Sequence, residues 1–198
     1  MSYSRFKKLK IVTQTFGLSA ERERLFEQIT NVEASAWLLE TLSISELLPL
    51  TNEKSKAERV ISPILTEIAR FYANKISFFS GENLAVNDNN DEFDKFQTHF
   101  LFSLQPLNLY VEAPVFSVIE TKSNDTDRIV ECAGQLYGGK LFNESENKNL
   151  PILYGCATDG IEWRFIRFEN NIFYVDTKVY TDLKEILGVW HHIIKSYL

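Results

Sequence analysis

The stretch Ala113-Pro-Val-Phe-Ser-Val-Ile-Glu-Thr-Lys122 is the centre of the predicted fold. Its apolar residues form an almost continuous run, which is typical of a central strand covered on both faces. Because side chains alternate along a strand, Glu120 and Lys122 point to the same side, about 7 Å apart along the chain. Burying a carboxylate and an ammonium group costs desolvation energy. The pair is therefore either exposed just beyond the core or held at the strand end for chemistry.

An acid-x-Lys pattern is weak by itself, because exposed ion pairs are common and contribute little to stability. The same spacing occurs three more times, at Glu146-Lys148, Asp176-Lys178 and Asp182-Lys184. These three are expected in loops or at a helix start. The preceding apolar strand is what distinguishes Glu120 and Lys122, and it makes a functional role for them a hypothesis worth testing.

Composition indicates one globular domain spanning residues 1–198. The chain is 44% hydrophobic and 13% aromatic, with 15 Phe, which excludes a disordered protein. No apolar run approaches the roughly 20 residues of a membrane span, and the first ten residues lack the apolar stretch of a signal peptide. Cys132 and Cys156 suit reduced core thiols. These features predict a cytoplasmic protein without a membrane partner; they do not indicate an oligomeric state.

The charge balance limits the possible partners. A net charge of −6 argues against broad, non-specific affinity for nucleic acid. A cluster of basic residues within the first ten positions could still form a local basic patch.

An N-terminal helical layer is predicted over residues 1–50. Ser19 can cap a helix that runs to about Ile29, and Asn31 can cap a second helix. A capping-box pattern at 43–46 predicts a short third turn. Nothing in this layer indicates chemistry.

A longer helix is predicted over residues 55–72, where apolar residues recur at helical spacing. Pro63 lies inside it and should kink it or end its first segment. Glu58 lies in the first turn. Because Ser55-Lys-Ala-Glu58 is a capping-box pattern, Glu58 has a structural explanation as well as a functional one.

Two strands are expected before the central one. Residues 76–80 form a short strand, 81–94 form a polar loop, and 96–104 form a second strand. The short link from there to the central strand predicts an antiparallel meander.

A helix and a further strand are expected after the central one. The helix runs over about 128–141, and Glu131 and Gln135 share one of its faces. They either hydrogen-bond to each other at the surface or face the strand end with Glu120 and Lys122. The strand at 151–156 follows a helix, so it should pair in parallel through a right-handed crossover.

The C-terminal part is predicted to close the sheet. Residues 161–168 and 172–175 form a hairpin around Asn170-Asn171. A final helix, starting near Thr181 or Asp182, packs a wide apolar stripe on the sheet over 181–198. His191 and His192 flank this stripe and are expected at the helix surface. Together the elements predict an α/β domain with helices covering a small mixed sheet.

Over residues 55–175 the chain resembles the PD-(D/E)xK nuclease superfamily, which has the restriction-endonuclease-like fold. The resemblance lies in the helix-strand-strand-strand-helix-strand order and in Glu120-Thr-Lys122 at the end of the third strand. The sequences of three segments also resemble those of a bacterial branch of that superfamily. The segments are Val111–Lys122, Glu131–Tyr137 and Tyr154–Trp163.

The resemblance implies metal-assisted hydrolysis of phosphodiester bonds in DNA or RNA, with Mg²⁺ or Mn²⁺ as cofactor. By position, Glu120 would bind the metal and Lys122 would orient or activate the attacking water. Glu58 would be the assisting helix acid and a further metal ligand. Glu131 and Gln135 would take the polar positions on the following helix.

One position departs from the family pattern. The second strand should carry an aspartate where this chain has His99, and the nearest acids, Glu92 and Asp94, lie at the end of the preceding loop. Neutral imidazole is a poor Mg²⁺ ligand but accepts transition ions. Either His99 is a ligand in a site for a softer metal, or another acid substitutes after a register shift. The third alternative is a degenerate site in a domain that serves binding or regulation.

Overall fold

A computed structural model describes residues 8–84, 96–106, 109–122 and 125–198. Its centre is a seven-stranded mixed sheet with the strand order β1-β9-β8-β7-β6-β5-β2. The strands are β1 (Ser19–Glu23), β2 (Ser77–Ser80), β5 (Phe100–Ser103), β6 (Val115–Thr121), β7 (Ile152–Thr158), β8 (Trp163–Glu169) and β9 (Ile172–Asp176). A separate antiparallel pair consists of β3 (Asn83–Leu84) and β4 (Phe96–Gln97).

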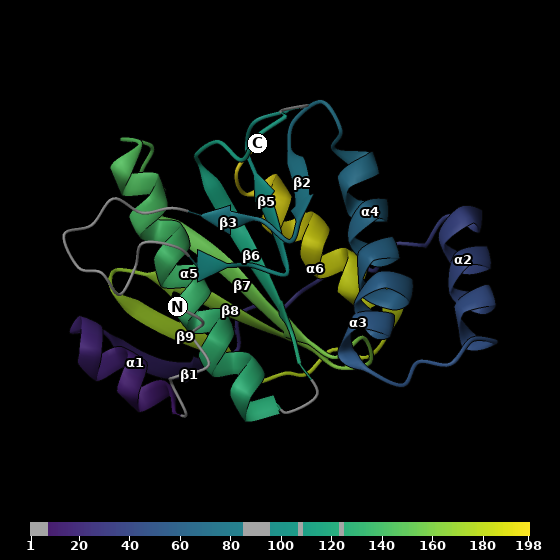
Figure 1. The fold of residues 1–198 in the computed structure, drawn as a ribbon, viewed down its shortest axis with the longest axis horizontal. Coiled ribbons are helices and arrows are strands. Elements are labelled where there is room, and N and C mark those ends of the chain that lie inside the picture. Colours follow the sequence, from purple (N-terminus) through teal and green to yellow (C-terminus); the bar gives the residue numbers. More distant parts are fainter. Residues whose placement is uncertain (1–7, 85–95, 107–108, 123–124) are drawn as a thin grey trace.

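Helices cover both faces of this sheet (Figure 1). The helices are α1 (Leu9–Phe16), α2 (Ala36–Glu46), α3 (Glu53–Lys56), the π-helix η2 (Ala57–Ile61), α4 (Ser62–Phe71), α5 (Asp125–Ser145) and α6 (Leu183–Lys195), of which α2 lies outside the others against α4 and η2. In Figure 1, α5 crosses in front of the sheet and α6 lies behind it. No helix in the described parts of the chain is long and apolar enough to cross a membrane.

The predicted central strand is confirmed as β6, which is buried at all seven positions. It pairs antiparallel with β5 and parallel with β7, and β5 pairs antiparallel with β2. Both the meander and the parallel crossover are therefore as predicted. The β8–β9 hairpin is also confirmed, because Asn170 and Asn171 both adopt the positive φ that its tight turn requires.

Two apolar cores lie on opposite faces of the sheet. On one face Phe116 and Ile119 of β6 pack with residues of α4 and α6, including Trp190. On the other face Val115 and Val118 pack with α5. Since Glu120 follows Val118 by two positions, its side chain points toward α5.

Helix α5 is fixed against the sheet by two close contacts. The Asn143 side chain accepts a hydrogen bond from the Val115 N–H and donates one to its carbonyl, both at 2.7 Å. A Cβ on Gly155 of β7 would lie 2.7 Å from Cys132 Sγ of α5, so only glycine permits this approach. The height and distance of α5 over β6 and β7 are thus set by specific residues.

The predicted helix around Pro63 forms as three consecutive segments, α3, η2 and α4. Proline has no N–H to give to the carbonyl four residues earlier, that of Arg59. The helix widens to a π turn just before it, and the Ser62 N–H donates to the Ala57 carbonyl. Ser45 Oγ of α2 donates to the Arg59 carbonyl at 2.8 Å. The freed acceptor is therefore satisfied from a neighbouring helix.

The N-terminal prediction is partly wrong. The helix expected from Ser19 to Ile29 is instead the strand β1, which pairs in parallel with β9. Its side chains are mostly exposed, so it carries no apolar alternation, and backbone pairing with a distant strand decides its conformation. The second helix is capped by Ser35 and not by Asn31, and residues 43–46 belong to its end.

Three further expectations need correction. The strand predicted over 96–104 is divided into β4 and β5, which lie in different sheets. The capping box at the start of α3 joins Asn52 and Ser55, so the expected Ser55–Glu58 box does not form. His191 is 9% exposed, and its Nδ1 lies 2.7 Å from the Tyr72 hydroxyl, so it is a core residue. The loop predicted over 81–94 lies mostly outside the described residues.

Candidate active site

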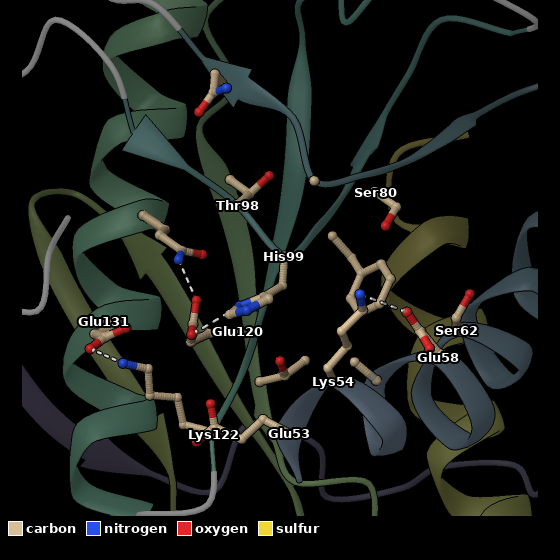
Figure 2. Close-up of a pocket in the computed structure, with 16 residues that line it drawn as sticks. Glu53, Lys54, Glu58, Ser62, Ser80, Thr98, His99, Glu120, Lys122 and Glu131 are labelled. Atoms are coloured by element: carbon tan, nitrogen blue, oxygen red, sulfur yellow. Dashed lines mark hydrogen bonds and ion pairs between the residues drawn. The ribbon is translucent and has the colours of Figure 1, made fainter. Parts of the chain in front are cut away.

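A cleft of about 860 Å³ opens at the end of β6. One wall is α5 and the opposite wall is α3 with η2 (Figure 2). Its lining includes every site residue that the sequence singled out: Glu58, His99, Glu120, Lys122, Glu131 and Gln135. Residues far apart in the sequence are thus brought to one place.

Glu120 is the most deeply buried acid of the cleft, with a fully buried residue surface. Gln135 Nε2 of α5 donates a hydrogen bond to Glu120 Oε2. The other carboxylate oxygen, Oε1, lies 3.0 Å from His99 Nδ1. Of the two alternatives left open for Gln135, the structure thus has the one in which it faces the strand end. The carboxylate is therefore held in one orientation from two sides.

His99 occupies the break between β4 and β5. Its carbonyl accepts a hydrogen bond from Gly81 N–H at 2.9 Å, which fixes the backbone across from the end of β2. Its side chain is 44% exposed and lies between Glu120 and the open cleft. The adjacent Glu120 carboxylate raises the pKa of His99, against the opposing effect of desolvation.

Lys122 forms the second pair of the cleft. Its Nζ donates to Glu131 Oε1 at 2.6 Å, with side-chain exposures of 28% and 9%. Desolvation lowers the pKa of Lys122, but the hydrogen bond to Glu131 and the other carboxylates of the cleft outweigh it, so the pKa is raised. This lysine is therefore a fixed cation at the mouth of the site.

Glu58 lies on the opposite wall of the same cleft. Its side chain is 60% exposed, and Oε1 lies 3.8 Å from Lys54 Nζ. Figure 2 shows the pair on the α3–η2 side of the cleft, across from Glu120. A neighbouring acid, Glu53, acts more directly on the cleft, since its charge contributes to raising the pKa of both His99 and Lys122.

The sequence patterns missed Glu53 because its position depends on where the helix begins. Residues 55–72 were expected as the helix, whereas Asn52 caps it and makes Glu53 its first residue. An acid directly after an Asn cap was the available signal. The lining also includes hydroxyl side chains that no motif indicated: Ser62, Ser80, Thr98 and Thr121.

Two of the other acid-x-Lys matches can be compared with this site. Asp176 ends strand β9, although a loop was expected there, and it accepts hydrogen bonds from the Tyr180 hydroxyl and the Lys178 N–H, each at 3.0 Å. Asp182 caps α6 through the Glu185 N–H. Both acids have structural roles, which sets Glu120 apart.

The side chains that could coordinate a metal ion indicate which metal the cleft could hold. Glu120 Oε1 is buried and receives no well-aligned hydrogen bond from the described residues, and His99 Nδ1 faces it. A carboxylate with an imidazole suits a transition ion such as Mn²⁺ better than Mg²⁺. Among the described residues, no group of three or more His, Cys, Asp or Glu side chains is arranged to hold a metal ion. Glu58 does not join Glu120 and His99.

No protein-family model matches the sequence, and no curated protein is significantly similar to it.

Proposed function

We propose that this chain is a nuclease-like protein of the PD-(D/E)xK type that acts on phosphodiester bonds of nucleic acid in the β6 cleft. A single observation carries the proposal. Glu120 and Lys122, at the end of a buried strand, meet polar side chains of the following helix and of the preceding strand in one cleft. The chain order of α4, β2, β5, β6, α5 and β7, with the short β3–β4 pair between β2 and β5, also supports the proposal, because the resemblance rests on this order of elements.

Each residue has a role that follows from its contacts. Gln135 holds Glu120 Oε2 in place, so that the other oxygen, Oε1, faces His99. Lys122, fixed by Glu131, supplies positive charge where a phosphate would bind and can orient water there. Glu120 and His99 are the residues that would hold a divalent ion. When bound, such an ion would polarise the phosphate and lower the pKa of a water molecule.

A second candidate is a nuclease-fold domain that binds its partner without hydrolysis. The proximity of His99 to Glu120 favours it, because a protonated imidazole would neutralise the carboxylate that a metal site needs. The two candidates differ in one measurable property, because only the first hydrolyses nucleic acid.

The test is cleavage of labelled DNA and RNA in EDTA, in Mg²⁺ and in Mn²⁺. We expect activity in Mn²⁺, weak or no activity in Mg²⁺, and a loss of about 100-fold or more in Glu120→Gln. The absence of cleavage with every metal, together with retained binding, would favour the second candidate. Equal activity of wild type and Glu120→Gln would show that the cleft is not the site.

The metal preference can be tested without any substrate. In calorimetric titrations, His99→Asp should gain Mg²⁺ affinity, because it restores an oxygen ligand beside Glu120. His192→Asp, an exposed change on α6, is the matched control and should leave metal binding unchanged. Equal Mg²⁺ affinity of wild type and His99→Asp would show that the proposed effect of His99 is wrong; in the cleavage assay, robust wild-type activity in Mg²⁺ would show the same.

A further inference from the structure

We propose that the cleft takes a short single-stranded segment of nucleic acid, such as a strand end, in preference to a duplex. This inference rests on the proposed function and adds the class of substrate. It follows from the size of the cleft, the balance of charge in its lining, and the hydrogen-bonding groups at its floor.

The size of the cleft suits a small ligand. Its volume of about 860 Å³ falls within the range of roughly 300–1,000 Å³ that is usual for small-molecule pockets. Helix α5 bounds one side and α3 with η2 the other (Figure 2). Specific duplex complexes bury roughly 1,000–2,500 Å² of protein surface, which calls for an extended face. A few unpaired nucleotides can enter a walled cleft of this kind.

The charge of the lining disfavours a long polyanion. Four glutamates line the cleft, Glu53, Glu58, Glu120 and Glu131, against two lysines, Lys54 and Lys122. Both lysines are ion-paired with glutamates of the same cleft. Duplex binding draws its affinity from contacts between many phosphates and unpaired basic side chains. A short segment brings few phosphates and therefore meets little repulsion.

The floor of the cleft offers hydrogen-bonding groups that match unpaired bases and sugars. Thr121 Oγ1 is buried and has no hydrogen-bond partner in the described parts of the chain. The Ser62 and Ser80 side chains also line the cleft. In a duplex the Watson–Crick edges are occupied, whereas in a single strand they are free to bind such groups.

The experiment measures binding by fluorescence anisotropy, in EDTA and in Mn²⁺. The probes are labelled single strands of about six nucleotides, as DNA and as RNA, and a DNA duplex of the same sequence. We expect the better single strand to bind at least about tenfold more tightly than the duplex. Its affinity should fall only weakly with salt, because few counterions are released.

Two matched lysine variants test whether the single strand binds in the cleft. Lys122→Met should weaken single-strand binding, and Lys140→Met should not. Lys140 is an appropriate control because its Nζ lies 2.6 Å from Glu144 and its side chain is 25% exposed, close to the values for Lys122, while it lies outside the cleft lining. Equal binding by the two variants would overturn the assignment to the cleft.

The outcomes separate this inference from the proposed function. Duplex binding as tight as single-strand binding, with cleavage of the duplex, overturns the inference and leaves the nuclease proposal standing. Failure to bind or cleave any of the probes in either condition overturns both.

Discussion

Lys122 Nζ and Glu131 Oε1 lie 2.6 Å apart across the gap between strand β6 and helix α5, and both side chains are mostly buried. Two other carboxylates of the cleft, Glu120 and Glu53, contribute to raising the pKa of this lysine. The pair thus differs from an isolated surface ion pair, because one cation offsets the repulsion between several acids.

We expect Lys122→Met to destabilise the protein by more than the about 0–1 kcal/mol of an exposed pair and by less than the about 3–5 kcal/mol of a fully buried one. The loss should be largest in EDTA and partly recovered in Mn²⁺, because an ion would replace the missing positive charge. Thermal unfolding of Lys122→Met and of the control Lys140→Met provides the measurement. Identical melting curves for Lys122→Met and wild type, with and without metal, would mean that Lys122 contributes no more to stability than an exposed surface ion pair.

Glu53, and not Glu58, should add to the effect of Glu120 on the pKa of His99. The charge of Glu53 is among the causes that raise the pKa of His99, whereas Glu58 is paired with Lys54 on the opposite wall. We therefore expect Glu53→Gln to lower the pKa of His99, measured by NMR titration of the imidazole. Glu58→Gln serves as the control and should leave that pKa in place; the reverse result would restore Glu58 as the helix acid of the site.

Ser45→Ala should destabilise the protein, because it removes a hydrogen bond to a backbone carbonyl of the π turn. The hydroxyl donates to the Arg59 carbonyl, which Pro63 leaves without its helical donor. Leaving a partly buried acceptor unpaired costs about 1–3 kcal/mol. Ser43→Ala removes an exposed hydroxyl from the same helix, which donates to the Glu40 carbonyl, and should cost less. Urea unfolding of both variants measures the difference, and equal values would mean that the carbonyl finds another donor.

His191 should make the protein less stable in mild acid. Burial, followed by the charge of Lys195, lowers its pKa, although Glu67 acts in the opposite direction. The folded state then binds a proton less readily than the unfolded state, whose histidine titrates near about pH 6.5. Stability from this group is complete above that pH and is lost as the pH falls through it toward the folded pKa.

The measurement is the free energy of urea unfolding at about pH 7.5 and about pH 5.5, on either side of the unfolded pKa. His191→Gln keeps a hydrogen-bonding group for Tyr72 and should lose less stability on acidification than wild type. His192→Gln, at an exposed position, should behave like wild type. An unchanged pH dependence in His191→Gln would show that other groups dominate.

Sequence patterns predicted the parts of the fold that local residues determine. The apolar run before Glu120 specified a buried strand, and the Asn170-Asn171 turn specified a hairpin. Strand β1 could not be predicted in this way, because its charged, exposed residues gain their conformation only from pairing with β9. Within the site, strand and helix periodicity indicated Glu120 and Gln135, whereas the role of Glu53 depended on a helix boundary.

The parallel pairing of β1 with β9 has a consequence for folding kinetics. Ser19 pairs with Ile172, so forming this pair closes a loop through most of the chain, whereas β7, β8 and β9 are consecutive and antiparallel. Closing long loops is entropically costly and slow. Because β1 is an edge strand, every other strand can pair without it. In pulsed hydrogen exchange, amides of β1 should therefore gain protection after those of β8, and earlier protection of β1 would mean that the sheet grows from its edge.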